Sequence, residues 1–204
     1  TKEFMKNQYQ TLNRSLIPQL AQNGLKLVRH YEDLTPKQAK YVDKYFEKDV
    51  YPVLTPMAVD SSRPFPLVRN KSLNIGALIY DKKKDVTDIA TVQVPSVLPR
   101  IVKLPSEEKD VTEIILLEEV IEKNLDKLFL SYDIVCAYPY RIMRNADFSI
   151  DEEETADLLK EIEKQLKQRQ WGEVIRLEVD EAMDKKLLKE LKNHLGVDDE
   201  VVYK

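Results

Sequence analysis

The chain has few of the residues that most enzymes use for catalysis. Its 204 residues include one cysteine, two histidines and four glycines. The single cysteine, Cys136, excludes an intrachain disulfide and a thiolate cage for a metal ion. The glycines lie too far apart to form a glycine-rich phosphate loop or a dinucleotide fingerprint. The sequence therefore predicts neither a metal site nor a cofactor site within this chain.

Basic charge and long apolar runs are also scarce, and each shortage excludes a class of protein. The 32 basic and 36 acidic side chains give a net charge of −4, whereas a nucleic-acid-binding surface needs an excess of Lys and Arg. No apolar run approaches the roughly 20 residues that cross a bilayer, and the N-terminus has no hydrophobic signal segment. Since a lone cysteine is typical of a reducing compartment, we predict a cytoplasmic protein without a nucleic-acid partner or a transmembrane segment.

The apolar pattern predicts two helices at the N-terminal end. Residues 2–23 carry apolar side chains at helical spacing, with Pro18 inside the run. A second helix is predicted from Thr35, where Gln38 completes a capping box, to about Val50. Joined by a short segment, the two helices form a predicted hairpin that buries its apolar stripe only against another part of a fold.

Beyond residue 50 the pattern changes from helical to extended, and seven of the ten prolines lie between residues 52 and 105. Strands are predicted at Leu73–Tyr80, Ile89–Val94, Arg100–Leu104, Thr112–Leu117, Ile134–Arg144 and Glu173–Val179. Helices are predicted through residues 120–128, from a cap at Ser149, and over residues 183–195 before Gly196. Because strands come in adjacent runs, we predict an α+β fold: a mixed β-sheet domain with two to three packed helices, preceded by the N-terminal helical hairpin.

The residues that suggest catalysis also have structural interpretations. His30 and His194 have no ligand partner near them in the sequence, which favours a surface or helix-end position over metal binding. Cys136 alternates with Ile134 and Tyr138 in a predicted strand, which indicates a packing role rather than a reactive thiol. The sequence thus offers no catalytic residue.

Residues 51–72 are too rich in proline and aromatic residues for a simple linker. They predict a fixed strap between two domains, with Phe65 between two prolines as its apolar anchor. The nearby cations Arg63, Arg69 and Lys71 suit an anion, and pairing with neighbouring acidic residues is the other interpretation.

Several stretches in order along the chain resemble bacterial polyphosphate kinase. Residues 51–60 (YPVLTPMAVD) and 64–66 (PFP) are similar to the passage that joins the N-terminal helical domain of that family to its head domain. Further similar stretches are 94–100 (VPSVLPR), 140–147 (YRIMRNAD), in which Met143 replaces a threonine, and 176–179 (RLEV).

This resemblance implies a multidomain cytoplasmic enzyme that reversibly transfers the terminal phosphate of ATP to polyphosphate through a phosphohistidine, with Mg²⁺. In the family, the phosphorylated histidine and most nucleotide contacts belong to C-terminal domains whose motifs are absent here, so neither histidine of this chain inherits that role. The chain is therefore expected to be an inactive fragment. Residues 1–50 correspond to the end of the helical domain, and residues 51–204 to the head domain, which helps to build a homo-oligomer.

Four cations in the similar stretches are candidates for contact with polyphosphate or for interdomain pairing: Arg63, Arg69, Arg100 and Arg144. Arginine suits phosphate because its planar fork donates two parallel hydrogen bonds. The alternative function is a self-contained, non-enzymatic α+β oligomerisation or binding module.

Overall fold

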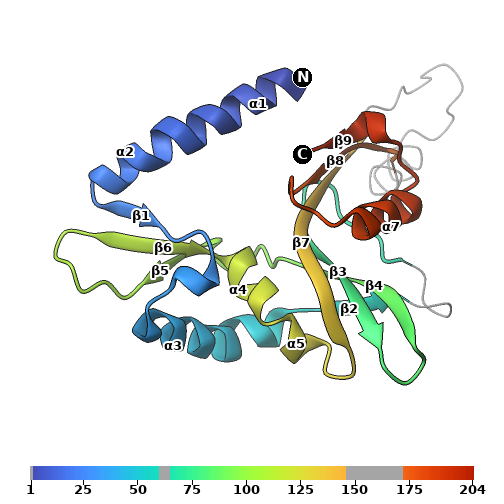
Figure 1. The fold of residues 1–204 in the computed structure, drawn as a ribbon, viewed down its shortest axis with the longest axis horizontal. Coiled ribbons are helices and arrows are strands. Elements are labelled where there is room, and N and C mark those ends of the chain that lie inside the picture. Colours follow the sequence, from blue (N-terminus) through green and yellow to red (C-terminus); the bar gives the residue numbers. More distant parts are fainter. Residues whose placement is uncertain (1, 60–64, 146–171) are drawn as a thin grey trace, which may run out of the picture.

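The computed structural model describes residues 2–59, 65–145 and 172–204. Within these ranges the chain forms a six-stranded sheet in the order β2-β4-β3-β7-β8-β9 and a three-stranded sheet in the order β1-β6-β5 (Figure 1). The strands are β1 (Leu25–Leu27), β2 (Pro56–Val59), β3 (Leu73–Asp81), β4 (Val86–Gln93), β5 (Ile101–Leu104), β6 (Thr112–Leu116), β7 (Asp133–Arg144), β8 (Val174–Val179) and β9 (Val202–Tyr203).

The helical elements lie mainly before β2, after β6 and after β8. They are α1 (Lys2–Thr11), a π-helical turn η1 (Leu12–Leu16), α2 (Ile17–Gln22), the short helices η2 (Tyr31–Asp33), η3 (Phe46–Val50) and η4 (Tyr51–Val53), α3 (Pro36–Tyr45), α4 (Leu117–Lys123), α5 (Leu125–Leu128), α7 (Lys185–Leu195) and η5 (Asp199–Val201). Mixed sheets with a few packed helices confirm the predicted α+β class. No helix in the described ranges is long and apolar enough to cross a membrane.

The large sheet has a hydrophobic core on each face. Strand β3 lies at its centre, paired antiparallel with β4 and β7, and six consecutive residues from Asn74 to Ile79 are buried, as a strand covered on both faces requires. One core joins Ile75 and Ile79 to side chains of α3, η3 and α4. The other joins Leu78 to the apolar stripe of α7. The sheet is therefore the middle layer between helices (Figure 1).

The predicted helix ends agree with the structure where they rest on capping residues. The Thr35 hydroxyl accepts from the backbone N–H of Gln38, whose side chain in turn accepts from the Thr35 N–H at 3.1 Å. At α7, Asp184 caps the start and Gly196 takes a left-handed conformation at the end, with φ of 65°. These local interactions need no partner from elsewhere in the fold, so the sequence alone specifies them.

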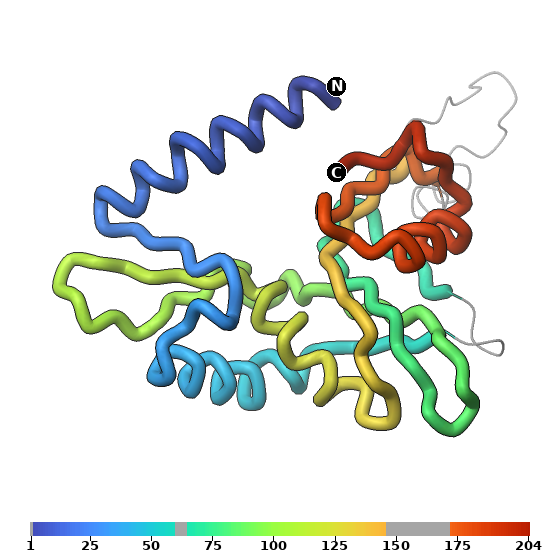
Figure 2. The backbone as a smooth tube through the Cα atoms, viewed as in Figure 1, coloured from blue at the N-terminus to red at the C-terminus, as the bar shows by residue number. Residues whose placement is uncertain are grey.

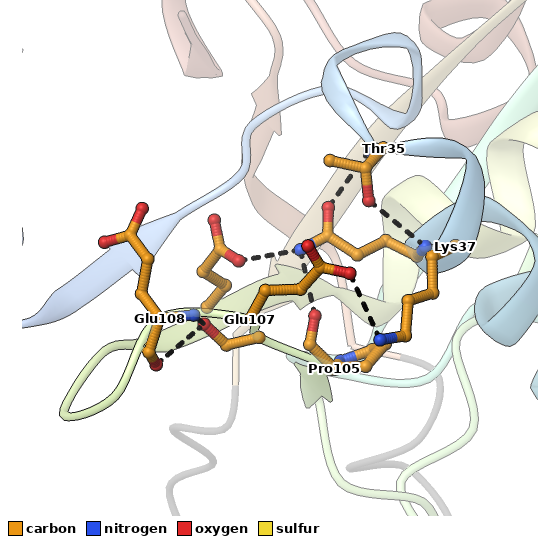
Figure 3. A network of polar contacts seen from close by, with 8 residues as sticks. Thr35, Lys37, Pro105, Glu107 and Glu108 are labelled. Carbon is orange, nitrogen blue, oxygen red and sulfur yellow. Dashed lines mark hydrogen bonds and ion pairs between the residues drawn. The ribbon is translucent and has the colours of Figure 1, made fainter.

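Gln38 also fixes α3 to the small sheet, within a network of polar contacts that includes Thr35, Lys37, Pro105 and Glu107 (Figure 3). Its side chain is buried, and its Nε2 donates to the Pro105 carbonyl oxygen at 3.2 Å and to Glu113 Oε2 at 2.8 Å. An exposed ion pair of 3.2 Å between Lys37 and Glu107 lies beside this network. The buried amide therefore has partners for both of its polar atoms, as a buried polar group requires.

The N-terminal hairpin needs a correction. The helix predicted over residues 2–23 is present as α1, η1 and α2, but the segment after it is strand β1, which pairs parallel with β6. In Figure 1 the small sheet lies between this helix and α3, so the two helices do not pack as a hairpin. Three residues are too few for a strand pattern to be recognised, and the pairing depends on β6, 85 or more residues away in sequence.

Two other strands, β2 and β9, are absent from the sequence prediction, and the helix predicted from Ser149 lies outside the described residues.

The hydrophobic core continues across the predicted domain boundary at residue 50. Val42, Phe46 and Val50 are fully buried in the same cluster as β3 and β4. In packing terms, α3 and η3 are therefore part of the sheet domain.

Candidate phosphate-contact and interdomain arginines

Arg144, at the end of β7, connects three segments of the chain. Its Nε donates to the Val68 carbonyl oxygen at 3.2 Å, and its Nη1 donates to the Gly172 carbonyl oxygen at 2.8 Å. Its backbone N–H donates to Asn70 Oδ1 at 2.9 Å. Desolvation lowers the pKa of Arg144. The guanidinium thus places two of its donors on neutral carbonyls and joins the strap to the residues just before β8.

Close packing at Gly172 explains why this junction is tight. A Cβ at that position would overlap the Asn145 carbonyl oxygen, so only glycine fits there. The Asn145 N–H donates to the Glu173 carbonyl oxygen at 2.8 Å. The end of β7 and the approach to β8 therefore form one compact unit around Arg144.

Arg69 lies beside this unit but is exposed. Within the described residues its side chain has no hydrogen-bond or ion-pair partner. Its carbonyl oxygen accepts from the Ser72 N–H at 3.2 Å and from the Ser72 hydroxyl at 2.8 Å, which closes a turn with Lys71 at a φ of 62°. The strap thus presents a cation to solvent at a fixed turn.

Arg100 has a different environment, just before β5 in the small sheet. Its Nε lies 3.0 and 3.1 Å from the two carboxylate oxygens of Glu118, and its Nη2 contacts the same carboxylate. The Glu118 side chain is only 7% exposed. The hydrogen bond to Glu118 raises the pKa of Arg100. This cation therefore neutralises a buried carboxylate, which leaves a phosphate little attraction here.

Arg63 lies outside the described residues. The structure thus brings Arg144, at the end of β7, next to the strap that contains Arg69. Arg100 lies apart from them, just before β5 of the small sheet. Phe65, the predicted anchor of the strap, packs against the hydrophobic core between the large sheet and α7. Its ring stacks on that of His194, with 4.9 Å between the ring centroids.

A pair of arginines that the sequence reasoning did not consider lies on strands β7 and β8. Arg141 Nε donates to Glu178 Oε2 at 2.6 Å, and Arg176 Nη2 lies 2.6 Å from Glu178 Oε1. The register pairs Arg141 with Glu178 and Met143 with Arg176, so all four side chains share one face of the sheet. The alternation of Arg, Leu, Glu and Val over residues 176–179 is the signal that indicates this polar face.

An acidic cavity of about 320 Å³ opens between η2, α4 and β7. Among the side chains that line it are Glu32, Glu119 and Glu122. Burial, with smaller contributions from neighbouring carboxylates, raises the pKa of Glu122 to about 7 and also raises that of Glu119. Lys123 also lines the cavity and pairs with Glu32 at 2.9 Å. In the described part of the chain, no three His, Cys, Asp or Glu side chains converge as a metal site.

The structure also places His30 and Cys136, the other residues considered for catalysis. The exposed His30 has its Nδ1 3.8 Å from Glu119. Cys136 is half-buried in β7 against the hydrophobic core between the large sheet and α7, and desolvation raises the pKa of its thiol. Both environments agree with the structural interpretations made from the sequence.

The comparison with protein families identifies this arrangement. The family model described as the polyphosphate kinase middle domain matches residues 37–204. The chain belongs to the polyphosphate kinase family. The match begins inside α3, whose buried residues share the core of the large sheet.

Similar proteins and a solved structure agree with this membership. The chain is 46% identical to "Polyphosphate kinase" of Lactiplantibacillus plantarum over 98% of its length and 44% identical to that of Bacillus anthracis over 98%. It spans only 28% and 29% of those proteins. The crystal structure of polyphosphate kinase from Porphyromonas gingivalis has the same fold, with a TM-score of 0.76 at 22% identity over 98% of this chain and 29% of that chain.

Proposed function

We propose that this chain is the non-catalytic scaffold of a longer enzyme that reversibly transfers the terminal phosphate of ATP to polyphosphate through a phosphohistidine. The observation that carries the proposal is the middle-domain match over residues 37–204, in a chain that spans 28% of a relative called polyphosphate kinase. The described residues provide a rigid sheet with a core on both faces, as a scaffold requires.

ATP and Mg²⁺ belong in this proposal to the parent enzyme, which we place in the cytoplasm. In the described ranges, no three carboxylate, His or Cys side chains converge as a metal site. We therefore assign no step through the metal ion to this chain. The phosphohistidine, likewise, lies in the part of the parent outside this sequence.

The experiment that tests the function compares this chain with its parent enzyme. Both are purified and incubated with ATP and Mg²⁺, and polymer is measured by its length on gels and by release of ADP. The parent is expected to form polyphosphate and the isolated chain to form none. A parent enzyme that forms no polymer, or consumes none in the reverse assay, would favour the alternative of a self-contained oligomerisation or binding module.

Of the four candidate arginines, Arg69 is the one whose surroundings support contact with polyphosphate. Arg144 and Arg100 already bind carbonyl oxygens and Glu118, which supports interdomain or structural pairing. Arg63 stays a candidate on its position in the strap alone. Polyphosphate titration tests this assignment: Arg69→Gln is expected to weaken binding and reduce its salt dependence, because each phosphate contact releases counterions. Equal affinities of wild type and Arg69→Gln would contradict it.

The scaffold also carries the proposed homo-oligomer contact through the sheet domain, residues 51–204 being its predicted extent. Deletion of the first 50 residues is a poor test, because Val42, Phe46 and Val50 are fully buried in the core. Deletion of residues 1–23 removes the exposed helix and spares these side chains. Light scattering is expected to give the same oligomeric state for both chains. A smaller oligomer after the deletion would place the contact on the N-terminal helix instead.

A further inference from the structure

The turn at the end of the strap, residues 69–72, is fixed to the large sheet. The Lys71 N–H donates to the Ile142 carbonyl oxygen of β7 at 2.9 Å. Asn70 Oδ1 accepts from the backbone N–H of Arg144, also at 2.9 Å. Strand β3 begins directly after the turn, and Figure 2 shows this part of the chain beside the end of β7. The turn is therefore held on both sides.

Lys71 has a backbone conformation that is unusual for lysine. Its φ of 62° lies in the left-handed region, where a side chain with a Cβ has a steric cost. The other two non-glycine residues with positive φ in the described ranges, Asp85 and Asp110, are aspartates, whose short polar side chains tolerate this conformation. Asparagine or glycine would suit the backbone of position 71 better, so an unfavourable lysine there points to a function of its side chain.

Three cations meet at this turn, and no carboxylate of the described residues pairs with them. Arg69 and Lys71 are exposed, and neither side chain has a hydrogen-bond or ion-pair partner in that part of the chain. Arg144 donates to two carbonyl oxygens, which leave its positive charge uncompensated. By contrast, Arg100 and Arg141 each pair with a glutamate. In a chain whose acidic side chains outnumber its basic ones, the turn is a local concentration of positive charge.

Such a turn suits an anion that carries several adjacent charges. Arg69 and Lys71 are separated by one residue on a backbone that is already fixed, so little order is lost when both bind one ligand. The arginine fork donates two parallel hydrogen bonds to one phosphate, and the lysine ammonium suits a second phosphate as a point charge. Linked phosphates therefore engage both cations, whereas a single phosphate loses the gain from the second contact.

We propose that Lys71 acts together with Arg69 as a second phosphate-binding residue, and that the turn holds two neighbouring phosphate groups of a linear polyphosphate. The choice of this polymer rests on the function proposed above, because ATP also carries linked phosphates. Arg144 adds its charge to the same turn through its place beside Val68. The site retains the polymer and takes no part in the chemical step.

Calorimetric titration of the whole chain with long-chain polyphosphate, at several salt concentrations, tests the proposal. Lys71→Asn removes the charge and introduces a residue that tolerates the left-handed conformation, so its melting temperature is expected to equal or exceed that of wild type. Its affinity is expected to fall roughly fivefold, and the slope of log affinity against log salt by about one. Lys71→Arg keeps the charge and is expected to keep the wild-type affinity.

Two control variants change the net charge by the same amount. Arg141→Gln removes a cation of β7 that Glu178 already neutralises, and Lys83→Gln removes an exposed cation beyond the opposite end of β3. Both are expected to bind polyphosphate with the affinity of wild type. An equal loss in either control would overturn the proposal, because net charge alone would then explain the binding. Wild-type affinity in Lys71→Asn would overturn it as well.

Orthophosphate and ATP, titrated in the same way, separate the classes of ligand. Lys71→Asn is expected to leave the binding of both unchanged. A loss for orthophosphate as large as that for the polymer would mean a site for one phosphate, and an equal loss for ATP would mean a nucleotide site; each result would overturn the assignment. A parent enzyme that forms no polymer would refute the function proposed above without altering these binding results, whereas unchanged binding by Lys71→Asn refutes this site alone.

Discussion

Replacement of Glu122 by glutamine is expected to stabilise the protein at pH 8 and to have little effect at pH 5. Glu122 lines the acidic cavity between η2, α4 and β7 with Glu119 and Glu32. Burial is the main cause that raises its pKa to about 7, and the charges of Glu119, Asp180 and Glu32 add to it. Glutamine has the same shape as the protonated acid and carries no charge, so it mimics the form that the folded state prefers.

The sign of the effect follows from proton binding. Between the ordinary glutamate pKa of 4.5, which applies to the unfolded chain, and the folded pKa of about 7, the folded state binds this proton more tightly than the unfolded state does. The stability that the group contributes is therefore complete below the lower pKa and is lost as the pH rises through the folded pKa. The full difference corresponds to about 3 kcal/mol, and partial solvent exposure of the cavity reduces the expected loss to about 1–2 kcal/mol.

Urea denaturation followed by circular dichroism measures this effect at pH 5, 6, 7 and 8. The free energy of unfolding of Glu122→Gln is expected to exceed that of wild type by about 1–2 kcal/mol at pH 8, with the two values converging at pH 5. Glu200→Gln, at an exposed position in η5, is the control and is expected to follow the wild-type profile. Parallel profiles for Glu122→Gln and wild type would refute the reasoning, because they mean that Glu122 titrates alike in both states.

Three further substitutions test how the fold is held together. Phe46→Ala is expected to lower the free energy of unfolding by about 3–5 kcal/mol, because its side chain is fully buried, whereas Tyr41→Ala, at a side chain 45% exposed, is expected to cost under about 1 kcal/mol; similar urea midpoints for the two would contradict this core. Arg100→Gln leaves its buried carboxylate partner without a cation and is expected to lower the free energy of unfolding by about 2 kcal/mol, by the same assay; a free energy equal to that of wild type would contradict the pairing. Gly24→Ala, with a φ of 82° and a Cβ position 2.5 Å from a carbonyl oxygen, is expected to lower the melting temperature more than Gly196→Ala, with a φ of 65° and open space around it; equal shifts would argue against the close contact.

Features that depend on neighbouring residues could be predicted from the sequence. The cap of α3 uses Thr35 and Gln38, three residues apart, and the strand β3 shows its burial as a nearly continuous apolar run. The helix α7 follows from its leucine spacing and from Gly196. Each of these signals lies within a few residues of the structure that it specifies.

Features that depend on distant residues could not be predicted in this way. Strand β1 has only three residues and exists because β6 pairs with it, and β9 has two residues beside β8. The partners of the candidate arginines also depend on residues that are distant in the sequence. Nothing near Arg144 in the sequence indicates that Val68 and Gly172 supply its acceptors, because the fold alone brings these carbonyl groups together.

We propose that the phosphate-accepting histidine of the parent enzyme lies outside this chain. Incubation with ATP labelled at the γ-phosphate, followed by detection of acid-labile phosphate on the protein, tests it most directly. The parent enzyme is expected to become labelled, and the isolated chain, with only His30 and His194, to remain unlabelled. Acid-labile phosphate on either of these histidines in the isolated chain would contradict the account.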